Sequence, residues 1–496
     1  MARAGRWFYW GAVAMVLALA ALLRLYKLDL VPFHHDEGVN GSFLVTLYRT
    51  GVYHYDPTNY HGPSLYYPAW ASSVIFGLSS FAVRLVTVVF GLLTVWLALR
   101  ARHLVGVVGA LATALFLAVS PGAVFFSRYF IHEMLLIAGT LGGVVAAERF
   151  LATRRLDSLL AASAWAALMF TTKETATPTA MVLVLALGCA LAYDALRNRS
   201  WAVVRAEVVS LIHTRDRLAL ILAAVSLFAV ISLALYSSFF THPRGVVDAI
   251  RALGPWVHTG VKAHVHPWWT YFNWIWRAET PLVILGGLGL IAALVFAESR
   301  RITFVAFWML GITAAYSLVP YKTPWLTLNL VLPLALLAGY LLDLLARRWP
   351  WVAGLVLLAA SAPALHQSVD LNFRRYDDDR LPYVYAHTQR GFLDLVRAVD
   401  RVAEMSGKGH QMVITIPAKE HWPLPWYLRN YRQAGYQDNI DAARASVLVI
   451  CNPDQEERLR TELGPAFDRL GKYPLRPGVE LIIFVQTVLV SGRPGI

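Results

Sequence analysis

Charged residues and cysteines are both scarce in this sequence. Of 496 residues, 15% are charged and 57% are hydrophobic, a balance too apolar for a soluble globular protein. Two cysteines define no disulfide framework. The sequence also lacks a glycine-rich phosphate loop, a dinucleotide fingerprint and an HExxH metal motif. These absences leave a membrane protein as the class that the composition favours.

Long apolar runs are abundant instead. A membrane-spanning helix needs about 20 predominantly apolar residues, and the mean hydropathy is +0.51. The runs predict about 11 spans, near residues 7–25, 81–99, 104–124, 133–150, 157–171, 176–195, 218–236, 281–297, 301–319, 325–343 and 350–365. We therefore expect an all-α transmembrane bundle with its first helix uncleaved.

The positive charge is concentrated in short links between these runs. The net charge of +13 could indicate nucleic acid binding, but its placement argues against a nucleic acid partner. One set of links holds Arg3 and Arg6, Arg100 and Arg102, Arg149, Arg154 and Arg155, residues 197–217, Arg300 and Arg301, and Arg347 and Arg348. Cations of this kind mark the cytoplasmic side. The sequence thus predicts a multi-pass protein of the plasma (inner) membrane, with its N-terminus inside and its C-terminus outside.

The opposite, outer side holds the longer segments. Residues 1–365 form the predicted membrane domain, including an outer loop over 26–80. In that loop Pro63 favours a helix start, and juxtamembrane helices are expected there and over 38–49. Residues 366–496 are more charged and alternate strand-like runs (411–416, 446–451, 480–485) with helix-like ones (426–433, 454–463). They predict a small extracytoplasmic α/β domain.

Several cations break the charge rule by lying at the outer boundary of the bundle. These are Arg84, Arg128, Lys173 and Lys322. Any one of them could merely reach the lipid headgroups. Four on one side favour a shared anionic ligand, and the phosphate of a lipid is the natural candidate.

Acids gather on the same side. Asp36 and Glu37 follow the first span, Glu133 opens the fourth span, and Glu174 adjoins Lys173. A carboxylate near the membrane interface suits a general base, although Asp36 could simply cap the following helix. Histidines including His61 are also frequent, but none has a strong metal-ligand spacing. No cofactor is certain from the sequence, and a divalent metal stays open.

These residues, in this order, resemble the polytopic glycosyltransferases of the GT-C class. The similarity extends from the Asp36-Glu37 pair through His61-Gly62-Pro63-Ser64-Leu65-Tyr66-Tyr67 to Ser127-Arg128-Tyr129 and Thr172-Lys173, and covers most of residues 1–345. The most similar members are the protein O-mannosyltransferases and the lipid A aminoarabinose transferases. Lys322-Thr323-Pro324-Trp325 and Trp422-Pro423-Leu424-Pro425-Trp426 resemble a prokaryotic branch associated with flipping of lipid-linked sugars. One departure is His132-Glu133, where relatives often have Leu-Asp.

The resemblance implies an inverting transfer of a sugar from a polyprenyl-phosphate carrier to an acceptor hydroxyl at the outer membrane face. The acceptor could be a protein, a glycan or a glycolipid. Asp36 would be the base, and Glu37 would position the acceptor or the loop. Arg128, Lys173, Lys322 and Arg84 would hold the donor phosphate, and His61, Glu133 and Tyr66 would position substrate. Alternatives are a non-catalytic transporter or flippase-associated component for lipid-linked sugars, and an inactive assembly subunit.

Overall fold

The computed structural model describes residues 3–490 apart from 203, 207–208, 210–216 and 263. Part of the predicted cationic link 197–217 therefore lies outside the described residues. The chain folds into two compact units. The first comprises Met1–Leu28, Thr50–Arg375 and Leu381–Tyr383; the second comprises Asp29–Arg49, Tyr376–Arg380 and Val384–Ile496. The division expected at residue 365 stays a prediction, and the start of the outer loop belongs with the C-terminal residues.

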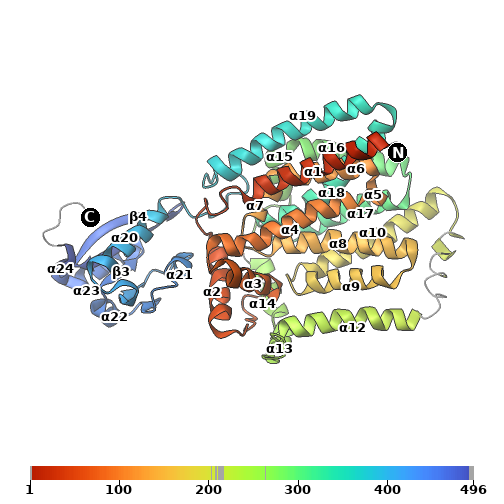
Figure 1. The fold of residues 1–496 in the computed structure, drawn as a ribbon. Helices are drawn as coiled ribbons and strands as arrows, with labels where there is room; N and C mark the ends of the chain where they lie inside the picture. The colour runs from red at the N-terminus through yellow and green to blue at the C-terminus, as the bar shows by residue number, and fades with distance from the viewer. Residues whose placement is uncertain (1–2, 203, 207–208, 210–216, 263, 491–496) are drawn as a thin grey trace. The chain divides into compact units, whose positions relative to one another are not determined.

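The first unit is helical and is a bundle of long helices that run side by side (Figure 1). Its helices are α1 (Arg3–Leu25), α3 (Tyr66–Phe76), α4 (Ser80–Arg100), α5 (Arg102–Val105), α6 (Val107–Val119), α7 (Pro121–Ser127), α8 (Glu133–Thr153), α9 (Leu156–Phe170), α10 (Ala176–Arg197), α12 (Arg217–Tyr236), α13 (Arg244–Arg251), α14 (Leu253–Lys262), α15 (Thr270–Ala278), α16 (Thr280–Phe296), α17 (Arg300–Leu318), α18 (Leu328–Arg348) and α19 (Pro350–Val369). Short 3-10 turns occupy Pro63–Leu65 and Pro324–Thr327, and a π turn occupies Asp370–Arg374.

The chain is a multi-pass membrane protein. Within the described residues, eight helices are long and apolar enough to cross a membrane. Two further pairs qualify jointly but are bent at a break, α6–α7 by 61° and α15–α16 by 115°, and α9 is a shorter apolar helix. These elements correspond to the eleven predicted runs. The predicted helical transmembrane bundle with a small C-terminal sheet is confirmed.

Helix α18 lies in the core of the bundle, where every residue from Leu328 to Tyr340 is buried. It packs against α6 and α16 where glycines let the backbones approach closely. A Cβ at Gly339 would lie 2.4 Å from the Gly109 carbonyl oxygen, and one at Gly289 would lie 2.1 Å from the Leu337 oxygen. Small residues at such crossings allow the van der Waals contact that holds helices together in lipid.

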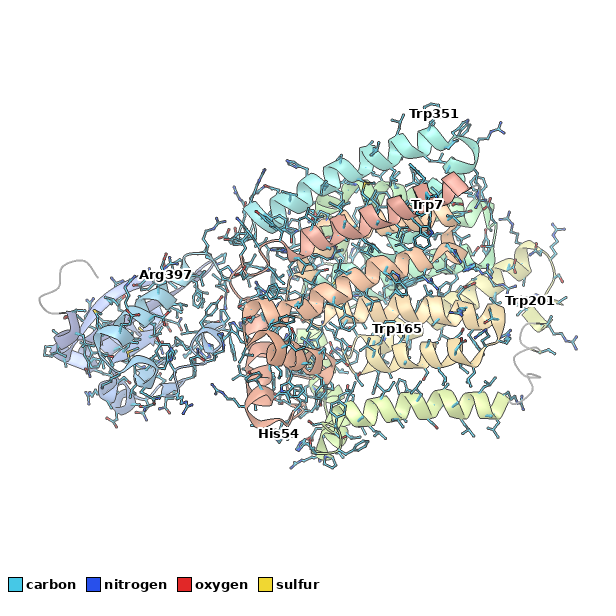
Figure 2. All side chains as sticks on the ribbon, viewed as in Figure 1. Trp7, His54, Trp165, Trp201, Trp351 and Arg397 are labelled. Atoms are coloured by element: carbon cyan, nitrogen blue, oxygen red, sulfur yellow. The ribbon has the colours of Figure 1, made fainter. Side chains whose placement is uncertain are left out.

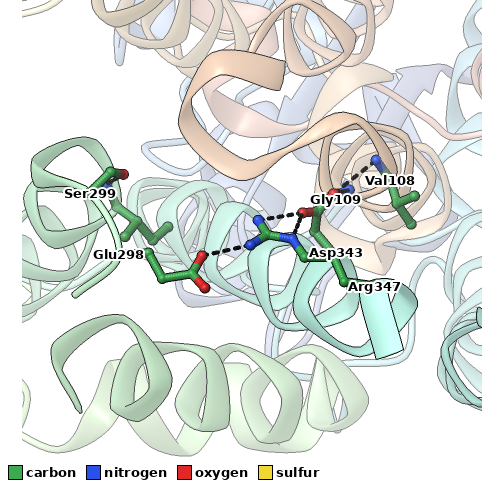
Figure 3. Close-up of polar contacts among 7 residues, drawn as sticks. Val108, Gly109, Glu298, Ser299, Asp343 and Arg347 are labelled. Carbon is green, nitrogen blue, oxygen red and sulfur yellow. Dashed lines mark hydrogen bonds and ion pairs between the residues drawn. The ribbon is translucent and has the colours of Figure 1, made fainter. Parts of the chain in front are cut away.

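Hydrogen bonds and ion pairs of Asp343 join α18 to the start of α6. The Asp343 carboxylate accepts hydrogen bonds from the backbone N–H groups of Val108 (3.1 Å) and Gly109 (3.3 Å). Arg347 then bridges Asp343 (2.9 Å) and Glu298 (2.9 Å), as Figure 3 shows. Carboxylates are favourable at a helix N-terminus, where unpaired N–H groups carry partial positive charge.

Exposed tryptophans mark one end of the bundle. Trp7, Trp201 and Trp351 are 76%, 58% and 69% exposed, and Figure 2 shows them at the same end of the helices, opposite His54. This end also carries Arg100, at the C-terminus of α4. Tryptophan favours the membrane–water interface, so the residues define one boundary of the membrane. Which side of the membrane this boundary faces stays a prediction.

The second unit is an α/β domain built on a five-stranded sheet, in the order β2-β1-β3-β5-β4. Its strands are β1 (Ile414–Thr415), β2 (Ala434–Gly435), β3 (Leu448–Cys451), β4 (Phe467–Arg476) and β5 (Val479–Gln486), with β1 parallel to β2 and β3 and with β5 antiparallel to β3 and β4. Its helices are α2 (His35–Thr50), α20 (Phe392–Met405), α21 (Leu424–Tyr427), α22 (Ile440–Ala445), α23 (Glu456–Leu463) and α24 (Thr487–Val490). Three of these strands were predicted. The helix expected over 426–433 is wrong, because only the single turn α21 forms there.

Candidate functional site

The Asp36-Glu37 pair lies in the first turn of α2, in the second unit. The Glu37 carboxylate is buried and accepts a hydrogen bond from the His34 backbone N–H (3.0 Å), which caps the helix start. The Asp36 side chain is half-buried, and within the described residues its carboxylate accepts no hydrogen bond. Glu37, rather than Asp36, therefore takes the capping role, and the Asp36 carboxylate stays partly exposed.

His34 fixes the backbone beside Asp36. Its Nδ1 accepts from the Asp36 N–H (3.1 Å), so its Nε2 carries the proton and donates to the Tyr385 carbonyl (2.9 Å). Burial lowers the pKa of His34, against the opposing effect of Asp36. The ring is therefore a neutral, oriented element of the turn.

Aromatic residues near position 426 hold this helix. Phe33 stacks on Trp426 with ring centroids 4.6 Å apart. A Cβ at Gly41 would lie 2.7 Å from the Trp426 ring, and one at Gly38 would lie 2.7 Å from Pro423. Trp426 is buried, so the aromatic segment Trp422–Tyr427 packs inside this unit and forms part of the support of the Asp36 turn.

In the first unit, the loop before α3 is fastened to the turn after α9. Gly62 N–H donates to the Thr172 carbonyl (3.0 Å), and Ser64 N–H donates to the Thr171 carbonyl (3.0 Å). A Cβ at position 62 would lie 2.1 Å from the Thr171 oxygen. Only glycine allows this close approach, which gives a physical reason for the His-Gly-Pro-Ser motif.

This junction brings two charged pairs together. The Lys173 ammonium is ion-paired with the Glu133 carboxylate, and both side chains are buried. His61 Nδ1 donates to the Glu174 carboxylate (2.9 Å). Burial acts to lower the pKa of Lys173, but the nearby Glu133 and Glu174 carboxylates outweigh it and raise that pKa. Burial likewise acts to raise the pKa of Glu174, yet His61 and Lys173 lower it. All four groups are therefore ion-paired or hydrogen-bonded to one another, with Lys173 and Glu133 buried and His61 partly exposed.

Two further rings complete this junction. His132 Nε2 donates to the Gly62 carbonyl (3.1 Å), and its ring lies 4.9 Å from that of His61 and 5.6 Å from that of Tyr66. Burial, with the positive charges of His61 and Lys173, holds the pKa of His132 well below its usual range. We call His61, His132, Glu133, Lys173 and Glu174 the polar cluster. Predicted residues His61, Glu133 and Lys173 belong to it, and Tyr66 borders it.

Arg128 has a different environment. Its guanidinium donates to the carbonyls of Leu23 (3.3 Å), Arg24 (3.0 Å), Tyr26 (2.7 Å) and Lys27 (2.8 Å). These are the unpaired carbonyls at and beyond the C-terminal end of α1, where cations are favourable.

Lys322 and Arg84 also contact backbone carbonyls. The Lys322 ammonium, fully buried, donates to the carbonyls of Tyr316 (2.9 Å), Ser317 (3.2 Å) and Val319 (2.6 Å) at the end of α17. Arg84 donates to Leu28 (3.1 Å) among its contacts. Lys173, in contrast, is ion-paired with a side-chain carboxylate of the polar cluster, that of Glu133.

A buried acid that the sequence reasoning missed lies at the break of α15 and α16. The Glu279 carboxylate accepts from Ser120 Oγ (2.7 Å) and the Gly122 N–H (2.9 Å). It thereby joins the break of α15–α16 to that of α6–α7. The sequence could have predicted this contact, because Glu279 directly precedes Thr280-Pro281 at the start of an apolar helix, and an acid in that position needs a polar partner.

A metal centre gains no support from these groups. Within the described residues, no three His, Cys, Asp or Glu side chains are arranged to hold one ion. The polar cluster pairs its charges internally, and it combines one ammonium, two carboxylates and two imidazoles, of which that of His132 is neutral.

Known proteins share this architecture. The family model of dolichyl-phosphate-mannose-protein mannosyltransferase matches residues 60–215, the range that contains the polar cluster. ArnT from Cupriavidus metallidurans in the apo state superposes with a TM-score of 0.68 at 15% identity, covering 97% of this chain and 99% of that chain. The chain has the GT-C fold. No protein of curated function matches it significantly in sequence.

Two further GT-C structures extend the likeness. ArnT from the same organism bound to undecaprenyl phosphate gives a TM-score of 0.63 at 16% identity, over 98% of this chain and 99% of that one. The Archaeoglobus fulgidus oligosaccharyltransferase, tethered with an acceptor peptide, gives 0.56 at 12% identity over 91% and 70%. At these identities the likeness establishes the fold, and the GT-C assignment made from sequence motifs is confirmed.

Proposed function

We propose that this chain is an inverting glycosyltransferase that moves a sugar from a polyprenyl-phosphate carrier to an acceptor hydroxyl at the outer membrane face. The observation that carries the proposal is the likeness to ArnT over nearly the whole of both chains, including ArnT bound to undecaprenyl phosphate. The family model over residues 60–215 supports the same chemistry. The N-terminus is cytoplasmic and the second unit extracytoplasmic in this proposal, which rests on the cationic links.

Asp36 is the proposed general base. It removes the proton from the acceptor hydroxyl as the oxygen attacks the anomeric carbon, while the bond to the phosphate oxygen breaks with inversion. The half-buried Asp36 carboxylate and the capping role of Glu37 support this division of labour. Glu37 then acts by shaping the turn rather than by proton transfer.

Lys173 is the proposed principal ligand of the donor phosphate. Its charge is maintained by Glu133 and Glu174, and a buried ammonium stabilises charge that develops on a leaving phosphate. Glu133, His61 and Tyr66 keep positioning roles around it. Arg84, Arg128 and Lys322 remain in the proposal as further cations, although Arg128 and Lys322 must exchange carbonyl hydrogen bonds to contact a phosphate directly.

The two roles separate experimentally. Undecaprenyl phosphate is titrated onto protein in nanodiscs, and transfer is assayed with a panel of undecaprenyl-phosphate sugars. Lys173→Met should weaken undecaprenyl phosphate binding at least tenfold, whereas Asp36→Asn should retain binding and lose turnover at least a hundredfold.

Matched controls use exposed residues of the second unit, namely Lys472→Met and Asp454→Asn, which should change neither quantity. Wild-type turnover in Asp36→Asn excludes that residue as the base. Unaltered binding in Lys173→Met excludes it as the phosphate ligand.

A further inference from the structure

A cavity lies at the end of the bundle away from the polar cluster. It has a volume of about 680 Å³, within the roughly 300–1,000 Å³ of small-molecule sites. It is lined by the last residues of α4, the start of α5, the second half of α8, α9 from Asp157 to Trp165 and the start of α17. Helix α8 carries Glu133 at its first residue and enters the cavity wall at Gly142, so about 14 Å of helix separates the cavity from the cluster.

The cavity exists because small side chains face one another between α8 and α9. Gly142, Ala146, Ala152, Ser158 and Ala161 contribute to its wall. Trp165, labelled in Figure 2, packs over Gly142, where a Cβ would lie 2.5 Å from its ring. Most of the wall is therefore apolar and suits hydrocarbon.

The rim is cationic. Arg100, Arg102, Arg149 and Arg301 line it, against the carboxylates of Glu148 and Asp157. Arg301 is paired with Glu148 (2.7 Å), and Asp157 is shared by Arg149 (4.0 Å) and Arg155 (2.9 Å). Within the described residues, Arg100 and Arg102 have no carboxylate partner, and Arg100 lies over the Trp96 ring (5.4 Å). The rim thus carries positive charge that its own acids leave uncompensated.

We propose that this cavity binds an anionic glycerophospholipid of the surrounding bilayer. The acyl chains occupy the apolar space between α8 and α9, and the phosphate lies at Arg100 and Arg102. Apolar walls below a basic rim at the membrane boundary are the features that recognise such a lipid. The site is separate from the proposed donor site and does not depend on the proposed function.

Binding of phosphatidylglycerol to the delipidated full chain in detergent tests this proposal. Phosphatidylglycerol should bind more tightly than zwitterionic phosphatidylcholine, and inorganic phosphate should not compete at millimolar concentration. Each arginine near the membrane surface contributes about fivefold in affinity, so Arg100→Gln with Arg102→Gln should weaken binding roughly 25-fold.

A second variant fills the cavity without changing charge. Ala152→Trp should abolish phosphatidylglycerol binding, whereas Ala147→Trp, on the exposed face of the same helix, should preserve it. Arg348→Gln, an exposed cation outside the cavity, is the matched charge control. Thermal unfolding without added lipid confirms that the variants are folded. The proposal would be overturned if Arg348→Gln lost as much affinity for phosphatidylglycerol as the double variant. It would also be overturned if Ala152→Trp bound phosphatidylglycerol as tightly as wild type.

Discussion

At the level of single residues, the polar cluster contains a buried ion pair in which the energy of each charge depends on its partner. Lys173 and Glu133 are 5% and 2% exposed. Desolvation of each charge is offset only while the other is present, so removal of one partner is far more costly than removal of both. A double-mutant cycle can therefore separate what the pair does for stability from what Lys173 does for the substrate.

Lys173→Met and Glu133→Leu should each lower the free energy of unfolding by about 3–5 kcal/mol, while the double variant should recover most of that loss. The recovered double variant should still lack transfer activity, because the phosphate ligand is gone. Thermal unfolding in detergent and turnover are the measurements. The exposed pair Arg458–Asp438 is the control, with an expected coupling below about 1 kcal/mol. Full turnover in the stable double variant would contradict the role given to Lys173.

His132 should make the protein sensitive to acid. Burial holds its pKa well below the usual value, so the native state keeps it neutral while the unfolded chain takes up a proton near pH 6.5. The contribution of neutral His132 to the free energy of unfolding is therefore complete above pH 6.5. It is lost as the pH falls below that value, by up to about 1.4 kcal/mol per pH unit. His132→Gln should flatten the stability profile between pH 6.5 and 5, and His258→Gln, at an exposed position, should leave it unchanged. An identical slope in His132→Gln and wild type contradicts this account.

At the scale of elements, helix ends explain most of the polar side chains at the boundaries of the bundle. Arg128 and Lys322 satisfy carbonyls at the ends of α1 and α17, and Asp343 satisfies N–H groups at the start of α6. Each group serves a terminus whose backbone has no partner of its own. The sequence correctly predicted Arg128 and Lys322 at helix boundaries, but a local pattern cannot tell a residue that caps a distant helix from one that binds a ligand.

Asp343→Ala should destabilise the bundle by about 2 kcal/mol, because it removes the acceptor of Val108 and Gly109 and the partner of Arg347. Asp343→Asn should cost less, since an amide oxygen still accepts from both N–H groups. Thermal unfolding in detergent measures both, and Arg348→Ala is the control on the same helix turn. An Asn variant as unstable as the Ala variant would show that the ion pair, and not the cap, dominates.

At the scale of the whole molecule, the spans were predictable and the second unit only in part. Runs of apolar residues fix membrane helices because the bilayer demands about 20 residues of each. The bends at Ser120 and Glu279 were not predictable, since they depend on contacts between helices. In the second unit, strand β4 was not predicted because Phe467–Arg476 is rich in charge. The helix expected over 426–433 does not form, because the aromatic residues there pack on α2 instead.

Residues nearly 400 positions apart therefore build the Asp36 turn together. Trp426→Ala removes the ring that contacts Phe33 and Gly41, and we expect a cost of about 3–5 kcal/mol in the second unit. Hydrogen exchange over residues 33–49 should accelerate, while exchange in α18 should not change. Trp349→Ala, at an exposed position, is the control. Unchanged protection of 33–49 would mean that α2 is stable without this contact.

We propose that this chain breaks the bond between the sugar and the lipid phosphate of its donor. Mass spectrometry of proteoliposomes loaded with undecaprenyl-phosphate sugars measures this directly, as free undecaprenyl phosphate released per protein. Wild-type protein should release undecaprenyl phosphate in the presence of a competent acceptor, and Asp36→Asn should release none. Intact donor that crosses the bilayer without release of undecaprenyl phosphate would contradict it and would indicate a transporter instead.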